Sequence, residues 1–522
     1  MKRILFAFFL LCSCLHSWAQ PLFGTEPQYP KREARAVWVT TLGGLDWPTA
    51  KATSEAGRQK QIAELGILMD KLKDAGINQI ILQTRVRASL IYPSTLEPWD
   101  IGLTNQAYGR HPGYDPLATA IDMAHQRGME LHAWVVTIPY NKKNNPGSTQ
   151  AGKAVVPLLV KHDDMYYLNP GLPQTADYLA RICREITSRY DVDGIHLDYI
   201  RYPENAERFN DAATYKKYAP KGQSKADWRR NNITHIVRTI YNEVKAEKPW
   251  VKVSSSPVGK FRDTRRFSSK GWNCYDAVYQ DAEGWLKEGI MDALYPMMYF
   301  QGDHFYPFVV DWKEHDQGRP VVPGLGIYFL SPKEKNWDFD VIGRELHFLR
   351  QMQMGGQAYF RSQFLTDNHK GIYDYLCQTY YAYPALTPAM TWQDSIPPSQ
   401  PTLVSIEDLA NEQERIVWHA ATDNLQAGGL HYNIYASREW PVDTSRAENL
   451  VLCQQSDTTF CYSRLSTQLY GMNFAITAID RCGNESEPLL LGKPIEQKDF
   501  RKILNLTVRK KDNKKSKKKG KK

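Results

Sequence analysis

The chain has 522 residues, of which 42% are hydrophobic and 12% aromatic. This length allows one large domain with a smaller one, or three domains of ordinary size. The net charge of +9 is local, because residues 501–522 hold 12 of the 66 Lys and Arg but one of the 57 Asp and Glu, which leaves −2 on the rest. The body of the protein is therefore not predicted to bind nucleic acid.

Residues 1–19 are typical of a signal peptide. Two basic residues precede an apolar run over residues 4–11, and small residues flank Trp18 ahead of a cleavage site after Ala19. The competing interpretation is a lipoprotein leader through Cys12, but that leader is unusually short. No later run is apolar for long enough to span a bilayer. We therefore expect an exported protein of the periplasm or the cell surface.

Eight short β-branched or apolar runs, most of them separated by helix-like stretches, dominate the first two thirds of the chain. The runs cover residues 34–41, 77–86, 129–137, 192–200, 251–258, 291–300, 319–328 and 356–364. Helices are predicted between them, for example over residues 61–76, 115–128 and 175–190. This alternation predicts an α/β fold, a (β/α)8 TIM barrel over residues 31–385. A doubly wound sheet is the alternative, but no GxGxxG follows the first strand.

The sequence changes character after Pro384. Short alternating strands are predicted at residues 431–437 and 473–488, and the latter resemble the closing strands of a fibronectin type III domain. We therefore expect a small all-β sandwich over residues 395–492. Residues 500–522 are rich in Lys and predicted to be disordered, either as a solvated end or as a weak tether to anionic envelope polymers.

The segment VDGIHLDYIRYP, residues 192–203, carries the strongest functional signal. If it forms the fourth barrel strand, His196 and Asp198 face the interior near the strand's C-terminal end, where barrel enzymes place their chemistry. Asp198 is therefore the candidate catalytic carboxylate, and a structural ion pair with Arg201 is the alternative. Asp193 has the opposite parity and is expected to hold a loop or a helix end.

Hydrolysis of a glycosidic bond needs a second carboxyl group. Asp281 is the first candidate for the general acid, although a helix N-cap role is at least as compatible with its position. Glu283, Asp303 and Glu204 come after it. Side chains at other strand ends converge on the same region, namely Arg85, Arg87, His132, Trp134, Tyr295, Met298, Tyr299, Tyr328 and Arg361. The Trp and Tyr rings among them are suited to stacking on sugar rings, although each alone is more often a packing residue.

No cofactor or metal site is predicted from the motifs. HExxH, GxSxG and a phosphate-binding loop are absent, and the six cysteines after the leader lack CxxC spacing. Pairing of Cys453 with either Cys461 or Cys482 remains open. The chemistry is therefore expected to come from side chains alone.

Six segments together resemble the glycosyl hydrolase-like family 10 domain of bacterial envelope proteins. They cover residues 32–42, 92–100, 113–137, 192–203, 279–300 and 318–330. The resemblance implies a barrel related to retaining glycosidases, often followed by a fibronectin-like module, and hydrolysis of a polysaccharide, which for some members is suggested to be peptidoglycan. Asp198 matches the family's DGIHxDYxRYP aspartate, and the positions that match its pocket are Trp38, Arg85, Trp134, His196, Tyr199, Arg201, Tyr295 and Tyr299.

One departure from the family pattern bears on activity. The family often has Gly-Asp before its YPS motif, where this chain has Ala88-Ser89. We therefore keep two hypotheses. The first is an exported glycosidase with Asp198 as nucleophile or base and Asp281 as acid, acting on an envelope, dietary or capsular polysaccharide. The second is a non-catalytic glycan-binding scaffold.

Overall fold

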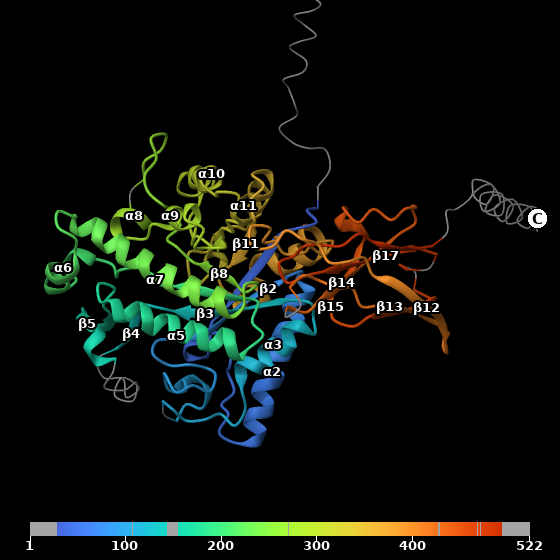
Figure 1. The fold of residues 1–522 in the computed structure, drawn as a ribbon, viewed down its shortest axis with the longest axis horizontal. Helices are drawn as coiled ribbons and strands as arrows, with labels where there is room; N and C mark the ends of the chain where they lie inside the picture. Colours follow the sequence, from blue (N-terminus) through green and yellow to red (C-terminus); the bar gives the residue numbers. More distant parts are fainter. Residues whose placement is uncertain are drawn as a thin grey trace, which may run out of the picture.

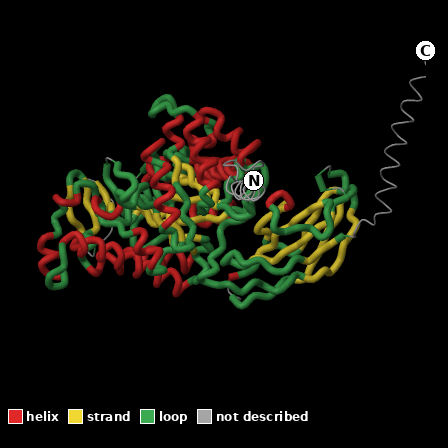
Figure 2. The backbone as a smooth tube through the Cα atoms, turned by 90° about the horizontal axis from the view of Figure 1, so that it is seen from above, coloured by secondary structure: helices red, strands yellow, loops and turns green. Residues whose placement is uncertain are grey.

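The structure, a computed structural model, describes residues 29–492 except 107, 143–154, 270, 426–427, 467 and 470. The predicted signal peptide and Lys-rich tail lie outside the described residues. The described chain forms a barrel of parallel strands surrounded by helices, with a module of strands and loops beside it (Figures 1 and 2).

Eight parallel strands form the barrel, and each lies within one of the eight predicted runs. They are β1 (Ala34–Val39), β2 (Gln79–Arg85), β3 (Glu130–Val136), β7 (Gly194–Asp198), β8 (Lys252–Ser255), β9 (Ala293–Leu294), β10 (Gly324–Leu325) and β11 (Gly356–Tyr359). Their order is β10-β11-β1-β2-β3-β7-β8-β9. Parallel pairing of Leu294 with Val321 and of Met297 with Gly324 joins β9 to β10 and closes the sheet. The predicted (β/α)8 barrel is confirmed.

Helices follow the barrel strands and cover the outside of the barrel. They are α2 (Glu55–Asp74), α3 (Pro116–His125), α5 (Pro173–Arg189), α6 (Ala212–Tyr218), α7 (Lys225–Glu247), α8 (Cys274–Ala277), α9 (Ala282–Lys287), α10 (Tyr306–Glu314), α11 (Phe339–Gln351), α12 (Ser362–Thr366) and α13 (Ile372–Tyr375). Asp115 caps α3 by accepting hydrogen bonds from the amides of Leu117 and Ala118. Ser54 starts α2 earlier than predicted because its hydroxyl caps Gly57 N.

A small antiparallel sheet interrupts the alternation after β3. Its strands are β4 (Pro139–Lys142), β5 (Leu159–His162) and β6 (Met165–Leu168), in the order β4-β6-β5. In Figure 1 this sheet lies at the end of the barrel that is remote from the C-terminal module. It follows the C-terminal end of β3, so it lies on the side of the barrel that carries the loops after the strands.

The C-terminal module is a sandwich of two antiparallel sheets. One contains β12 (Thr402–Leu409), β13 (Gln413–His419) and β16 (Thr459–Ser463), and the other β15 (Leu450–Gln455), β14 (His431–Ser437), β17 (Asn473–Ile479) and β18 (Leu489–Leu491). Trp418, Phe460, Ile434 and Ile476 belong to one buried cluster that draws on both sheets. The predicted all-β sandwich is confirmed, while its relation to fibronectin domains stays a prediction.

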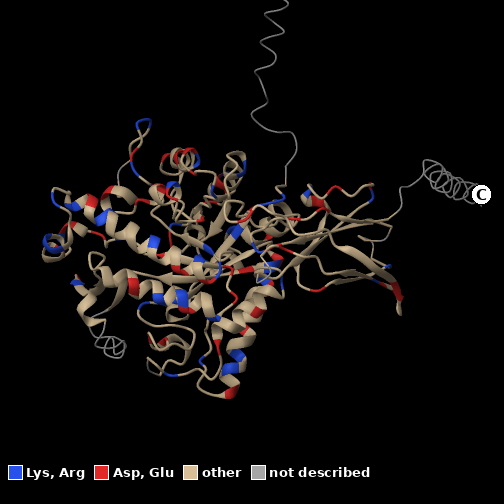
Figure 3. Ribbon diagram, viewed as in Figure 1, with Lys and Arg blue, Asp and Glu red and all other residues tan. Residues whose placement is uncertain are grey.

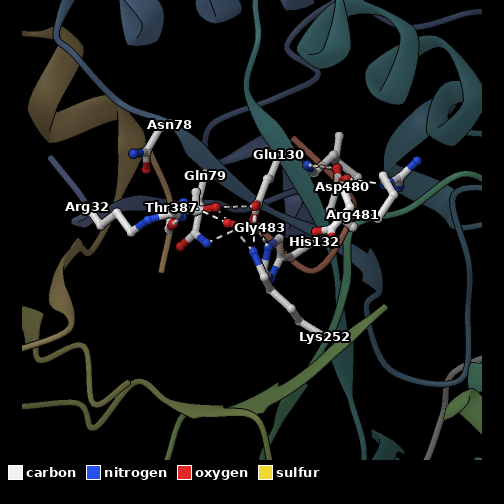
Figure 4. A network of polar contacts seen from close by, with 12 residues as sticks. Arg32, Asn78, Gln79, Glu130, His132, Lys252, Thr387, Asp480, Arg481 and Gly483 are labelled. Atoms are coloured by element: carbon white, nitrogen blue, oxygen red, sulfur yellow. Dashed lines mark hydrogen bonds and ion pairs between the residues drawn. The ribbon is translucent and has the colours of Figure 1, made fainter. Parts of the chain in front are cut away.

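A polar cluster fills the N-terminal end of the barrel (Figure 4). Glu130 accepts hydrogen bonds from Gln79 and Thr387 and forms an ion pair with Lys252. His132 contacts the same carboxylate at 2.9 Å. Burial raises the pKa of Glu130, but the Lys252 charge and the His132 hydrogen bond outweigh burial and hold it below its usual range. The ion pair of Glu130 with Lys252 therefore stabilises this end of the barrel.

The sandwich is fastened to the same end of the barrel. Arg481 donates to Asp191 at 3.0 Å and to Asp193 at 3.1 Å. Asp193 also accepts a hydrogen bond from the amide of Leu131 and contacts His125 at the end of α3. Burial raises the pKa of Asp193, but His125 and Arg481 outweigh it and lower this pKa. Asp193 therefore joins a helix end to the second domain.

Acidic and basic residues are interspersed along α2 and α7 on the outside of the barrel (Figure 3). Within the described residues, no helix is long and apolar enough to cross a membrane.

Glu345 on α11 is expected to make the stability of the protein depend on pH. Its side chain is 1% exposed, neither carboxyl oxygen has a partner among the described residues, and burial raises its pKa to about 9. Between the unfolded pKa of about 4.3 and this value, the folded state binds more protons than the unfolded state, so stability falls as pH rises. Glu345→Gln should remove this loss, which reaches about 1.4 kcal/mol per pH unit.

The measurement is urea unfolding of both proteins at pH 5, 6.5 and 8, in which the stability advantage of Glu345→Gln should grow with pH. Asp340→Asn, at an exposed site on the same helix, is the control and should show no such trend. An advantage that is the same at all three pH values contradicts the prediction.

Candidate functional site

Asp198 ends β7 at the C-terminal side of the barrel, and donors hold both of its oxygens. Trp134 Nε1 donates to Oδ2 at 3.0 Å, while the Ser256 hydroxyl and the Tyr199 amide donate to Oδ1 at 2.9 and 2.8 Å. The side chain is 5% exposed, and burial raises its pKa although these hydrogen bonds oppose the rise. The carboxyl group is therefore fixed in position and costly to ionise.

His196 lies one inward position before Asp198 and is held in one tautomer. The indole N–H of Trp38 can only donate, so it donates to His196 Nε2 at 3.2 Å. The proton is then on Nδ1, which donates to the Ser254 hydroxyl at 3.0 Å. Burial, with the nearby His132, lowers the pKa of His196 well below its ordinary value. His196 is therefore a neutral support beneath Asp198 rather than a proton donor at neutral pH.

Aromatic rings line the barrel end beside Asp198. Tyr299 stacks on Phe360 with ring centroids 5.4 Å apart, and Tyr328 packs edge-on against Tyr299 at 5.8 Å. Burial, followed by the Asp198 charge, raises the pKa of Tyr299 well above its usual value, which places this phenol near the carboxylate. Trp38 packs edge-on against Phe360. Such a wall has flat faces that suit sugar rings.

Arg201 lies on the loop after β7 between two exposed rings. Its guanidinium is 4.9 Å from the ring centre of Tyr199 and 4.8 Å from that of Trp272, and these residues are 38% and 39% exposed. Tyr199 has a φ of +52°, a conformation that a side-chain-bearing residue rarely adopts and that costs about 1–3 kcal/mol. Among the described residues, Arg201 forms no ion pair with Asp198.

The candidates for the second carboxyl group lie in different surroundings. Asp281 caps α9 by accepting a hydrogen bond from the Gly284 amide at 3.2 Å, and burial raises its pKa. Glu283 lies close to His315 and Asp311. Glu204 is exposed on the loop after β7. Burial raises the pKa of Tyr199, and the charges of Asp198 and Glu204 add to this rise. Glu204 and Asp198 therefore act on the same phenol.

Asp303 is exposed in the turn that precedes α10, and no hydrogen bond or ion pair of its side chain is found among the described residues.

Three of the predicted sugar-binding residues bond elsewhere in the interior. Arg85 forms an ion pair with Glu97 at 2.6 Å, and His132 contacts Glu130. The Tyr295 hydroxyl donates to Gln79 at 2.9 Å. The structure brings together Trp38, Trp134, His196, Asp198, Tyr199, Arg201 and Tyr299, and the Tyr295 ring packs edge-on against Trp38 and His196 in the same cluster. Arg85 and His132 bond to interior carboxylates instead.

Sequence reasoning missed four contributors to this site. Ser254 and Ser256 face inward at the end of β8 and hold His196 and Asp198. Their alternation in the SSSPVG run was a usable signal, because inward-facing serines at a barrel strand end lie beside the neighbouring strand's polar residues. Trp272 carried no such signal, because it lies outside the predicted strands, and Phe360 was passed over although Arg361, the next residue, was a candidate.

Among the described residues, two groups of side chains have a spacing that suits a metal ion. They are Glu283 with Asp311 and His315, and Asp394 with Asp423 and Asp480. Neither group contains Asp198.

Comparison with known proteins gives the following matches. Residues 33–325 match the family model described as glycosyl hydrolase-like 10. "Glycosyl hydrolase YngK" of Bacillus subtilis (strain 168) is 29% identical over 482 residues, 87% of this chain and 92% of that protein. "Glycosyl hydrolase DigH" of Escherichia coli (strain K12) is 33% identical over 322 residues, 56% of this chain and 73% of that protein. The glycoside hydrolase domain of PgaB (BpsB) from Bordetella bronchiseptica aligns with a TM-score of 0.47 at 14% identity, over 66% of this chain and 98% of that domain.

Ser256→Ala should raise the pKa of Asp198, because the Ser256 hydroxyl stabilises the ionised carboxylate. A hydrogen bond to a charged group is worth about 1.5–3 kcal/mol, which corresponds to a rise of about one unit or more. The measurement is a 13C NMR titration of the aspartate carboxyl groups. Ser254→Ala, two residues earlier on the same strand, is the matched control and should leave the Asp198 resonance in place. An unchanged pKa in Ser256→Ala contradicts this account of the site.

Proposed function

Because the chain belongs to the glycosyl hydrolase-like 10 family, we propose that it hydrolyses glycosidic bonds in a bacterial envelope polysaccharide, with peptidoglycan glycan strands as the first candidate. The observation that carries the proposal is Asp198, a buried carboxyl group at the C-terminal end of a barrel strand, held by three donors and bound to no cation in the described chain. A purely structural aspartate at such depth is expected to be ion-paired.

Asp198 supplies the first carboxylate of a two-carboxylate mechanism. The donors on both oxygens favour the ionised acceptor, so Asp198 acts as the nucleophile or as the base that orients water. Trp134 and Ser256 keep it in place while the sugar lies against the aromatic wall beside Tyr299. Fixed donors of this kind limit reorganisation during the reaction.

The general acid is Asp281 or Glu204. Asp281 is the sequence-based candidate, and its raised pKa suits a proton donor, but its hydrogen bond to Gly284 N serves the cap of α9. Glu204 shares the Tyr199 neighbourhood with Asp198 and is exposed to a substrate. The role of the general acid can be tested separately from that of Asp198, because a substrate with a good leaving group does not need protonation by the acid.

The proposed location is the cell envelope. The leader-like residues 1–19 support export, and the Lys-rich residues 500–522 support a weak tether to anionic envelope polymers. The C-terminal sandwich then acts as a holder, since Arg481 fastens it to the barrel end opposite the Asp198 site.

Asp198→Asn should lower the release of soluble fragments from purified peptidoglycan by at least about 10²-fold, because the carboxylate chemistry is lost. Asp193→Asn, five positions earlier, is the matched control. It should keep the activity but lower the melting temperature more than Asp198→Asn does. The pKa of Asp193 is lowered because its partners stabilise the ionised carboxylate, and this stabilisation is present at neutral pH. Peptidoglycan with and without its stem peptides is the substrate.

Fragment release by the wild type and not by Asp198→Asn supports the glycosidase. If neither protein releases fragments while both bind the glycan, the protein is a non-catalytic scaffold and the proposal fails. If Asp193→Asn is the inactive variant instead, the site lies at the other end of the barrel.

Glu204→Gln and Asp281→Asn identify the acid. The variant that lacks the acid should lose activity on the glycan yet keep it on an aryl glycoside of the same fragment, whose phenolate leaves without a proton. A variant that retains glycan activity is not the acid. If both retain it, neither Asp281 nor Glu204 is the acid, and this assignment is wrong.

A further inference from the structure

Two acidic side chains and a histidine from two helices meet in a group that does not include Asp198. Glu283 lies in the first turn of α9, while Asp311 lies in α10 and His315 follows the last residue of that helix. His315 Nδ1 is 3.6 Å from Glu283 Oε1 and 3.7 Å from Asp311 Oδ1. Figure 1 shows both helices on the same side of the barrel. The three side chains therefore face one another between α9 and α10.

The two carboxyl groups of this cluster are buried without hydrogen-bond donors. The Asp311 side chain is 9% exposed and the Glu283 side chain 15% exposed. No described residue donates a hydrogen bond to either carboxyl group, and Glu283 Oε1 is buried without a partner. Elsewhere in the protein a buried carboxylate such as Asp211 is bonded directly to Arg229. Two neighbouring buried carboxylates without donors are costly, so a cation from outside the chain is expected between them.

The cationic side chains nearby do not neutralise the cluster. Arg266 is bonded to Glu314 on the surface. Arg262 packs over two aromatic rings and forms no ion pair with a described residue. His315 is 43% exposed, and its distances to both carboxylates exceed that of a hydrogen bond. The protein itself therefore supplies no direct partner for the two carboxylates among the described residues.

The spacing of the three groups suits a metal ion. Ligand atoms that each lie about 2.1 Å from one ion are about 3.0–3.4 Å apart. The gaps of 3.6 and 3.7 Å from His315 Nδ1 are within a few tenths of an ångström of this separation, and all three ligand atoms lie within 4.8 Å of one another. The C-terminal end of α10 also favours a cation, because helix carbonyls carry partial negative charge there.

Metal binding uses the other tautomer of His315. In the metal-free protein Nδ1 donates to the Asp311 carbonyl oxygen at 2.8 Å, so its proton goes to the main chain and to neither carboxylate. An ion bound at Nδ1 takes the place of this proton, which is lost to solvent, while Nε2 takes one up and the ring stays neutral. The same carbonyl oxygen is then within reach of the ion as a fourth ligand.

The types of ligand atom indicate the class of metal. One imidazole nitrogen with two carboxylate oxygens suits a first-row divalent metal such as zinc, whereas calcium and magnesium take oxygen ligands. The second group with a metal-like spacing, Asp394 with Asp423 and Asp480, offers oxygen alone. Each of these three carboxylates already accepts a hydrogen bond from a main-chain amide. The cluster of Glu283 is therefore the better site for a transition metal.

We propose that Glu283, Asp311 and His315 bind one divalent transition-metal ion, with zinc as the expected occupant, and that this ion fastens α9 to α10. The inference goes beyond the proposed function, because the ion shares no ligand with Asp198 and supplies no step of the hydrolysis. It also gives Glu283, which the sequence offered as a reserve candidate for the general acid, a structural role instead.

The test measures zinc binding to the full protein after its metals have been removed with EDTA. Equilibrium dialysis with elemental analysis should give one zinc ion per chain, and the melting temperature should rise with zinc concentration because the ion binds the folded state. His315→Ala should lower the affinity at least about tenfold, and so should Asp311→Asn. His315 is partly exposed, so its replacement by Ala is expected to leave the fold intact.

Glu314→Gln is the matched control. Glu314 lies on the same helix between Asp311 and His315, but it is exposed and bonded to Arg266. The substitution removes one negative charge beside the site and should leave zinc binding unchanged. Cobalt(II) gives a second readout, because the visible absorption of the bound ion reports its ligands. This absorption should appear with the wild type and with Glu314→Gln but not with His315→Ala.

Three results would overturn the proposal. If the wild type takes up no zinc, the three side chains are only a cluster of charges. If His315→Ala binds zinc with unchanged affinity, the ion lies elsewhere in the chain. If the protein binds calcium in preference to zinc, His315 is not a ligand. One zinc ion per chain that is lost with His315→Ala and kept with Glu314→Gln supports the site, whether or not the protein hydrolyses a glycan.

Discussion

A closed parallel barrel places alternate residues of every strand in an interior shut off from solvent, and this constraint governs the polar groups of the protein. Each of them needs a partner inside the barrel, because an unpaired buried polar group is costly. The N-terminal end meets the requirement with the ion pair of Glu130 and Lys252, and the middle with His196 between two partners. Asp198 meets it with three donors and without an ion pair to a described residue, so its carboxyl group is held in position at the rim.

One short segment serves both ends of the barrel. Asp193 and Asp198 stand five positions apart around β7, and the strand between them carries them to opposite ends. At Asp193 the hydrogen bond from His125 and the Arg481 charge outweigh burial and lower the pKa, whereas at Asp198 burial outweighs the hydrogen bonds and the Arg201 charge and raises the pKa. The ionised form of aspartate is thus stabilised by its surroundings at one end of the barrel and destabilised by burial at the other.

Buried charged groups without ion pairs lie together at the C-terminal end of the barrel. Asp198, at the end of β7, and Arg201, three residues later on the loop, are a buried acid and a buried cation that form no ion pair with any described residue. Tyr199 between them adopts a left-handed backbone conformation. Proteins break the rules of pairing and backbone preference at functional sites, while the remainder of the fold supplies the stability. Paired arginines such as Arg85 and Arg229 follow the ordinary rule in the same protein.

The sequence by itself determined the eight strands, the helices between them and the all-β module, since hydrophobic period and capping residues are local properties. Strand parity and strand end also sufficed to put His196 and Asp198 at the C-terminal side of the barrel. The tertiary structure alone decided which side chains from different strands meet, because closure of the whole sheet sets register and tilt. Only the structure therefore shows that Ser256 holds Asp198 and that Arg85 and His132 bind interior carboxylates instead of facing the site.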